Sequence, residues 1–318
     1  MSANAAVQEK KKAVARKDMT KWQWTWKEIK RNKVAYVMVA PFMLIFTLFT
    51  VVPVVVSMLL SFTNFNMLQV PDIVFMDNYI TLFLDDDIFL TAIQNTFVFA
   101  VIVGPASYVI SFICAWFINE LPPKIRAIVT FIFYSPSISG SAYLMWTIVF
   151  SSDAYGYANA ILIDMGIIAS PILWFENTKY IMPICIIVAL WTSLGVSFLS
   201  FIAGFQGIDK SLFEAGAVDG VKNRWQELWY ITLPTMKPQL MFGAIMSITN
   251  SFGFGAIVTA LCGFPSYEYA AHTIMHHLED YGNTRWEVGY ASAIATILFA
   301  IMLGANMVVK KMLGKVGK

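Results

Sequence analysis

Long stretches without a charged residue alternate with short charged segments along this chain. Each stretch exceeds the roughly 20 residues that an α-helix needs to cross about 30 Å of hydrocarbon at 1.5 Å per residue. One such run could be a buried helix of a soluble protein, but six in series predict six transmembrane helices. The runs are Val34–Pro71, Ile88–Asn119, Ala127–Ser152, Tyr180–Ile208, Pro238–Tyr267 and Val288–Val309.

Several residues within these runs predict local departures from a straight helix. Pro41 and Pro53 favour a kink in the first span, because proline cannot donate the backbone hydrogen bond of a helix. Gly253 and Gly255 predict a bend or a close helix approach in the fifth. The expected spans are residues 35–61, 91–119, 125–150, 180–207, 238–261 and 288–312.

Composition supports the membrane assignment. Only 13% of the 318 residues are charged and 58% are hydrophobic, whereas about 25% are charged in a soluble domain. The spans are too long and too uniformly apolar for β-barrel strands, which alternate over about 10 residues. The predicted fold is an all-α, polytopic membrane bundle of six transmembrane helices with one charged loop between the fourth and fifth.

The basic residues predict the orientation. Six crossings place both termini on one side, and this side receives all but two, Lys179 and Arg285, of the 22 Lys and Arg residues. By the positive-inside rule, both tails and the charged segment after the fourth span are cytoplasmic. We therefore expect a multi-pass plasma-membrane protein that contacts lipid, and nothing in the net charge of +2 suggests nucleic acid.

Two parts are expected along the chain. Residues 1–33 form a cytoplasmic tail, in which Thr20–Asn32 mixes tryptophans with Lys and Arg and predicts a helix at the membrane interface. Residues 34–318 form the six-span domain. No cleavable signal segment is expected, because the first apolar run starts too late and is too long.

The segment from Ile208 to Pro234 is the least membrane-like between two spans. Its charges, at roughly 2.5–3.5 kcal/mol each for a central Asp, Lys or Arg, exclude a bilayer helix. Asp209 or Ser211 can cap a short helix through about Val218, which Gly220 would end. A second short helix is expected over Arg224–Tyr230, ending before Pro234. The seven charged residues are Asp209, Lys210, Glu214, Asp219, Lys222, Arg224 and Glu227.

This segment resembles the EAA loop of the ABC importer permeases. The motif reads Glu214-Ala215-Gly216-x-x-Asp219-Gly220 and continues with Ile231-x-Leu233-Pro234. Gly216 replaces the usual alanine, and the stretch from Gly220 to Ile231 is one residue longer than usual. Flanking words resemble the carbohydrate-uptake, maltose-type branch: they are Ala203–Ile208, Gly289–Ile294, Asn95-Thr96 and Tyr155-Gly156.

The resemblance implies a complex. A second homologous permease pairs with this one, two cytoplasmic ATP-binding subunits carry ATP and Mg, and an extracellular solute-binding protein delivers sugar. This chain itself would bind no cofactor. The loop would transmit ATPase motion, with Glu214 as the charged contact. The residues implied in coupling are Glu214, Ala215, Gly216, Asp219, Gly220, Leu233 and Pro234.

The sugar would bind between the fourth and fifth spans, where hydroxyls, an amide and aromatic rings occur together. These side chains could equally pack or bond their own backbone. Alignment with the family implies a role in sugar binding for Ser193, Asn250 and Gly253. The substrate candidates are Trp191, Ser193, Ser197, Asn250, Gly253 and Phe254.

The histidines, the acidic triplet and the cysteines indicate less about function. His272 and His276 are four apart on a possible helix, with His277 beside them, but no HExxH pattern occurs. We expect no metal site there and an outer-loop surface instead. The acidic triplet Asp85–Asp87 is expected to be a solvated loop. Three scattered cysteines, Cys114, Cys185 and Cys262, are typical of small apolar packing residues.

Alternative functions stay open to different degrees. An ABC permease for peptides or amino acids is the nearest rival. An ion-coupled secondary transporter would need ionisable residues inside the spans, and the six runs have no Asp, Glu, Lys or Arg. An intramembrane enzyme would need a buried nucleophile and base, and no catalytic residue is predicted. The phosphate-binding GxxxxGK[ST] pattern is absent, so this chain is not expected to hydrolyse ATP.

Overall fold

The computed structural model describes residues 20–313. The predicted tail residues 1–19 and the last residues, 314–318, lie outside the described residues. The described chain falls into two units, one ending at Leu59 and the other beginning at Leu60.

The described part of the first unit, residues 20–59, is helical. The helix α2 (Lys21–Arg31) is capped by Thr20 and Gln23, which bond each other's backbone in a capping box. The helix α3 (Lys33–Phe46) contains Pro41 and continues through a π-helical turn, Thr47–Val51, into α4 (Val52–Leu60). The π turn lies just before Pro53, where the backbone adjusts to the missing donor. The expected helix over Thr20–Asn32 is thus present, while its position at the membrane interface stays a prediction.

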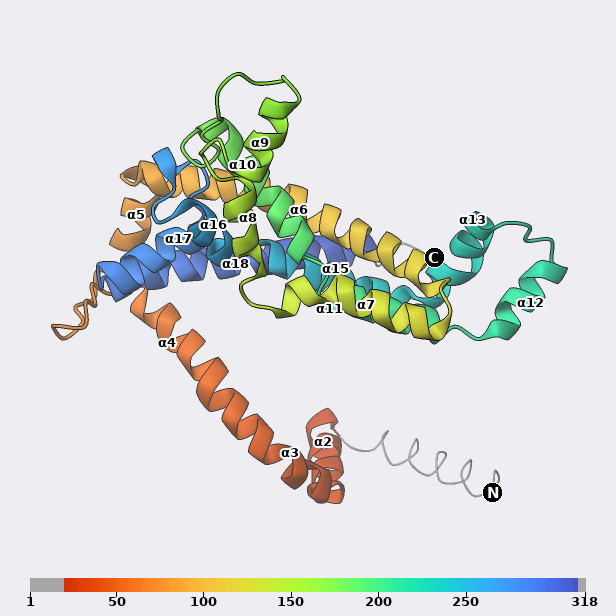
Figure 1. Cartoon of the computed structure of the whole chain (residues 1–318). Helices are drawn as coiled ribbons and strands as arrows, with labels where there is room; N and C mark the ends of the chain where they lie inside the picture. The colour runs from red at the N-terminus through yellow and green to blue at the C-terminus, as the bar shows by residue number, and fades with distance from the viewer. Residues whose placement is uncertain (1–19, 314–318) are drawn as a thin grey trace. The chain divides into compact units, whose positions relative to one another are not determined.

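The second unit is a helical bundle around α6 (Asp87–Asn119), which packs against α11 (Val196–Gln206), α15 (Lys237–Ser251) and α10 (Thr178–Thr192) (Figure 1). The other helices are α5 (Asp77–Leu84), α7 (Pro123–Ile138), α8 (Met145–Val149), α9 (Tyr157–Asp164), α12 (Lys210–Val218), α13 (Arg224–Glu227), α14 (Leu233–Thr235), α16 (Gly255–Cys262), α17 (Ile274–Glu279) and α18 (Val288–Leu313).

Within residues 20–313, four helices are long and apolar enough to cross a membrane, and the number reaches six if each of two bent helix pairs is one span. The all-α prediction is confirmed. The second, fourth and sixth spans form long helical segments, with α10 and α11 as consecutive parts of the fourth. The second begins at Asp87, earlier than expected, because Asp86 caps it.

The third and fifth spans are bent. A helical span over residues 125–150 was expected, and the structure breaks it: α7 and α8, with the short 3₁₀ turn Ala142–Leu144 between them, meet at 83°. Pro136 lacks a donor, Gly140 has φ +67°, and the Ser139 hydroxyl accepts from Ala142 N–H at 2.9 Å. In the fifth span, α15 and α16 meet at 42° beside Gly253, so the expected bend is confirmed.

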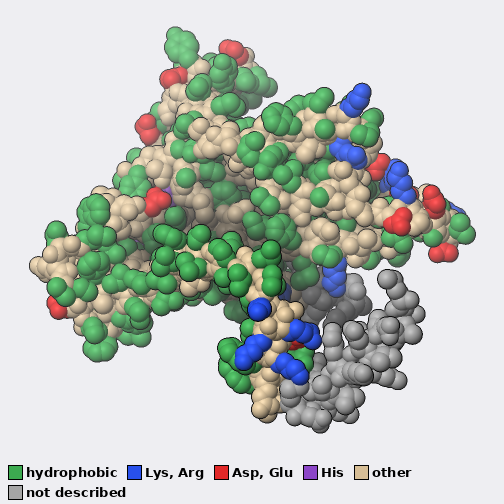
Figure 2. All heavy atoms as spheres, turned by 90° about the horizontal axis from the view of Figure 1, so that it is seen from below, with side chains coloured by type: hydrophobic (Ala, Val, Ile, Leu, Met, Phe, Trp, Pro, Cys, Tyr) green, Lys and Arg blue, Asp and Glu red, His purple; other side chains and the backbone are tan. Residues whose placement is uncertain are grey.

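The two ends of this unit differ in chemistry. α12 and α13 lie at one end, and α5 and α17 at the other (Figure 1). Charged side chains gather at the end that carries α12 and α13, whereas few occur on the rest of this unit in view, where hydrophobic side chains are widespread (Figure 2). A largely apolar surface next to a charged end is what a protein that spans a bilayer requires.

Candidate functional sites: a charged loop and a polar cavity

The loop after α11 folds as the sequence predicts at its first helix. The Asp209 side chain accepts the backbone N–H of Ser211 at 3.0 Å and caps α12. This hydrogen bond lowers the pKa of Asp209. At the other end, Val221 N–H bonds the Gly216 carbonyl at 2.9 Å while Gly220 adopts φ +93°. This is a Schellman turn, which Gly220 makes possible.

The second half of the loop differs from the prediction. A helix ending before Pro234 was expected, and this is wrong. After α13 the chain forms a π-helical turn, Leu228–Thr232, and continues as α14 through Pro234. The wider turn accommodates the proline near the start of α14, where its missing N–H matters least.

Gly216 allows the two halves of the loop to pack closely. It is buried, and a Cβ added there would lie 2.6 Å from Cδ1 of Ile231. Glycine at this motif position therefore lets Ile231 pack against α12. Glu214 and Ala215 are exposed instead, and Val218 is 88% exposed. From Glu214 to Val218, α12 thus exposes one carboxylate beside small and apolar side chains.

The loop is also fastened to the bundle. Arg224 bonds Glu120 of the α6–α7 connection at 2.7 Å and Glu227 of its own helix at 3.0 Å. Trp225 meets Trp116 of α6 edge to face, with ring centroids 5.1 Å apart. A cavity of about 510 Å³ lies between the loop and the ends of α6 and α7. The α13 half of the loop is therefore in direct contact with the ends of α6 and α7.

A second cavity, of about 400 Å³, lies between the fourth and fifth spans and α7. It brings together five predicted substrate residues, Ser193, Ser197, Asn250, Gly253 and Phe254. Trp191 does not line it, because its indole packs edge to face against Trp146 at 5.7 Å. The remaining lining residues are Ser107, Tyr134, Ser137, Thr192, Gly195, Val196, Ser247 and Thr249.

Most hydroxyl hydrogens of this cavity are already used. Ser193 donates to Leu190 O at 2.7 Å, and Ser197 donates to Gly243 O at 3.2 Å. Their oxygens keep lone pairs for a ligand's donors. Asn250 is exposed and offers both a donor and an acceptor. None of the described lining residues is charged. The cavity can therefore accept hydrogen bonds from a neutral, hydroxyl-rich ligand.

Sequence reasoning missed the contributions of α6 and α7 to this cavity. Ser107 lies in α6, while Tyr134 and Ser137 lie in α7 near its break. The cluster of serines around Pro136 was a usable signal, since it predicted polar groups where a helix is interrupted. Only the bend brings that cluster to the cavity.

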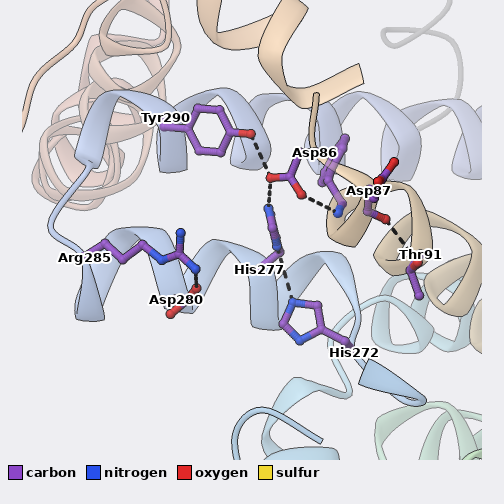
Figure 3. Close-up of polar contacts among 9 residues, drawn as sticks. Asp86, Asp87, Thr91, His272, His277, Asp280, Arg285 and Tyr290 are labelled. Atoms are coloured by element: carbon purple, nitrogen blue, oxygen red, sulfur yellow. Dashed lines mark hydrogen bonds and ion pairs between the residues drawn. The ribbon is translucent and has the colours of Figure 1, made fainter. Parts of the chain in front are cut away.

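The opposite end of the unit holds a buried polar cluster (Figure 3). Asp86 caps α6 through Phe89 N–H at 2.8 Å, and it also accepts from Tyr290 at 3.0 Å and from His277 Nε2 at 2.9 Å. The description of Asp85–Asp87 as a solvated loop is therefore wrong for Asp86. The cluster ties α6, α17 and α18 together.

The histidines are not on a surface. His272, His276 and His277 are each 2% exposed or less, and His272 precedes α17 rather than lying on it. His272 Nε2 lies 3.4 Å from His277 Nδ1. No group of residues able to hold a metal occurs among the described residues. The prediction of an exposed loop is wrong, because rings such as Phe89 and Phe264 pack against the histidines. The expected helical spacing of His272 and His276 is also wrong, because α17 begins only at Ile274.

Burial predicts an acid sensitivity. Desolvation lowers the pKa of His272 to about 3 and that of His276 to about 4. Both rings are therefore neutral in the folded protein near pH 7. Their contribution to the free energy of unfolding is fully present above pH 6.5, the unfolded-state pKa, and is lost as the pH falls from 6.5 towards the folded-state pKa values. When the pH falls from 7 to 5, we expect His272 and His276 each to lower the free energy of unfolding of this end by about 2 kcal/mol.

Thermal denaturation of the purified protein between pH 5 and 7 checks this expectation. The variant His272→Gln should flatten the dependence, while Asp153→Asn, at an exposed turn, should not. An unchanged slope in His272→Gln would contradict the assignment.

Together, a bundle with broken spans, a polar internal cavity and a charged loop at one end define a helical membrane transport protein. No protein-family model matches the chain. It is 30% identical to the probable ABC transporter permease protein YesP of Bacillus subtilis over 308 residues, which cover 95% of this chain and 93% of the relative. It is 27% identical to the arabinooligosaccharides transport system permease protein AraP of the same organism, covering 91% and 92%.

Solved structures agree. A bacterial ABC transporter involved in alginate import superposes with a TM-score of 0.72 at 23% identity, over 92% of this chain and 99% of that chain, and shows the same fold. The chain belongs to the ABC transporter permeases of the carbohydrate-uptake family. It is accordingly a transport subunit rather than an enzyme.

Proposed function

We propose that this permease passes a neutral sugar or oligosaccharide across the plasma membrane. The uncharged cavity beside the bend of the fifth span carries the proposal. A peptide or amino acid carries charged groups that would be left unpaired in such a cavity at a cost of several kcal/mol. A saccharide offers hydroxyl donors for the serine oxygens and an apolar ring face for Phe254.

Relatives support this substrate class. AraP is named for arabinooligosaccharide transport, and LacF of Rhizobium radiobacter, 30% identical over 217 residues, is named for lactose transport. In the cavity we assign Asn250, Ser193 and Ser197 to hydrogen bonding and Phe254 to ring contact. Gly253 permits the bend beside them. Trp191 would then act only by packing against Trp146.

We further propose the assembly in which the permease works. A second homologous permease completes the pathway, two cytoplasmic ATP-binding subunits supply ATP and Mg, and an extracellular solute-binding protein delivers the sugar. A solved alginate ABC transporter in complex with an alginate-bound periplasmic protein, 25% identical over 91% of this chain, supports the part played by the solute-binding protein. Both termini would be cytoplasmic, on the side of the charged loop.

Within this assembly, the loop from residue 208 to 234 is the coupling element. Glu214 and Ala215 would contact the ATPase, whereas Gly216 and Gly220 shape the loop internally. Asp219, Leu233 and Pro234 complete the motif. The Arg224–Glu120 contact would carry movement from α12 to α6.

The test is reconstitution of the complex in proteoliposomes with candidate neutral saccharides. Sugar uptake should require ATP, the ATPase subunits and the partner permease. The variant Asn250→Leu should raise the sugar concentration needed for half-maximal uptake about tenfold or more, because it removes a polar partner and leaves ligand hydroxyls unpaired. Thr235→Val, on α14 away from the cavity, is the matched control. Uptake of an amino acid or peptide instead would overturn the proposal.

A further inference from the structure

Two of the three cysteines meet inside the second unit. Cys185 of α10 and Cys262, the last residue of α16, have their Sγ atoms 3.6 Å apart, which is van der Waals contact. The third cysteine, Cys114 of α6, packs in a different core cluster. Both members of the pair are free thiols.

The helices that carry this pair also carry walls of the polar cavity. Thr192 ends α10 and Phe254 immediately precedes α16, and both line the cavity. α16 is the bent half of the fifth span, and α10 and α16 pack against each other. A bond between the sulfurs would therefore tie the bent half of the fifth span to the fourth.

The two thiols differ in access. Cys185 is fully buried, whereas Cys262 is partly exposed at the C-terminus of its helix and is followed by Gly263 at φ +75°. Cys262 is thus the sulfur that a soluble reagent reaches first. In the proposed orientation it lies near the outer face.

We propose that Cys185 and Cys262 form a reversible disulfide by exchange with a small disulfide oxidant. The Cys262 thiolate attacks the oxidant's S–S bond and releases one thiolate. The Cys185 sulfur then loses its proton, attacks Cys262 Sγ in the mixed disulfide and releases the second. The pair loses two electrons, the oxidant gains them, and the two protons end on its two thiols.

The consequence for transport rests on the proposed function. Alternating access requires cavity walls to move relative to one another. A covalent link at Cys185–Cys262 would hold α16 against α10 and trap one state. The oxidised permease should therefore be inactive until a reductant restores the thiols.

The experiment treats the reconstituted complex with oxidised glutathione, alkylates the remaining thiols under denaturing conditions and analyses the peptides by mass spectrometry. We expect a linked Cys185–Cys262 peptide, at least a tenfold loss of uptake, and recovery in dithiothreitol. Cys262→Ser should be active and insensitive to the oxidant. Cys114→Ser, the matched control, should respond like the parent protein.

Three outcomes would overturn the inference: no linked peptide, linkage through Cys114, or a Cys185–Cys262 link without loss of uptake. Uptake measured first in the reduced complex separates this inference from the proposed function. A reduced complex that takes up no saccharide contradicts the proposed function, while the peptide analysis still decides whether the disulfide forms.

Discussion

Replacing Glu214 with alanine is expected to abolish ATP-driven uptake while the permease still inserts and folds. Glu214 is exposed on α12, and within the described residues its side chain makes no hydrogen bond or ion pair that holds the fold. An exposed substitution of this kind changes folding stability by about 0.5 kcal/mol or less. If its carboxylate pairs with a cation in an ATPase cleft, its loss removes a charge-assisted contact worth several kcal/mol.

Uptake by Glu214→Ala should fall at least tenfold, and saccharide should no longer stimulate ATP hydrolysis. Co-purification with the ATPase subunits and the thermal midpoint of the permease are measured beside uptake. Lys222→Ala is the matched control, because Lys222 lies in the same loop, exposed and outside the motif. Normal uptake by Glu214→Ala would remove the basis for assigning this loop to coupling.

The sequence was a good guide to features that depend on local chemistry. Uncharged runs predicted membrane-capable helices, because bilayer insertion depends on each segment's own composition. Asp209 and Gly220 predicted the ends of α12, since caps are formed by residues adjacent in the chain. The five predicted residues that line the cavity lie on two consecutive spans, so their proximity followed from the order of the helices.

The features it missed depend on contacts between distant segments. Nothing near Asp86 indicates that His277 and Tyr290, some 200 residues away, become its partners. The histidines looked exposed because they lie in a polar connection, but the ends of α6 and α18 enclose them. Trp191 had the composition of a sugar contact, and only the position of Trp146 shows that it packs instead.

The structure explains the short sequence motifs that resemble the family. Asn95 donates from its side chain to the carbonyls of Tyr269 and His272, and the Thr96 hydroxyl accepts Ile274 N–H at 2.9 Å. These bonds fasten the connection between the fifth and sixth spans to α6. Such motif residues maintain the fold, and they are poor indicators of the substrate.

Gly289 also belongs to these motif residues, and we expect its replacement to have a large effect on stability. Its N–H donates to the Phe65 carbonyl at 2.8 Å, so the start of α18 lies directly against the segment that follows the first span. A Cβ added at Gly289 would be 2.0 Å from the Thr63 carbonyl oxygen. The obstacle is backbone rather than a flexible side-chain tip, so it cannot move without breaking its own contacts.

Gly289→Ala should therefore destabilise the second unit by about 3 kcal/mol or more, the upper part of the range for overpacking. That corresponds to a thermal midpoint lower by roughly 6–12 °C. Gly304→Ala, in the same helix α18, has no atom within 4 Å of the added Cβ and should be neutral or slightly stabilising. Because both changes add one methyl group to one helix, equal midpoints would show that α18 does not approach Thr63 this closely. A selective loss in Gly289→Ala, accompanied by weaker protection of Tyr290 and Asp86 from solvent exchange, would establish the contact as the anchor of the sixth span.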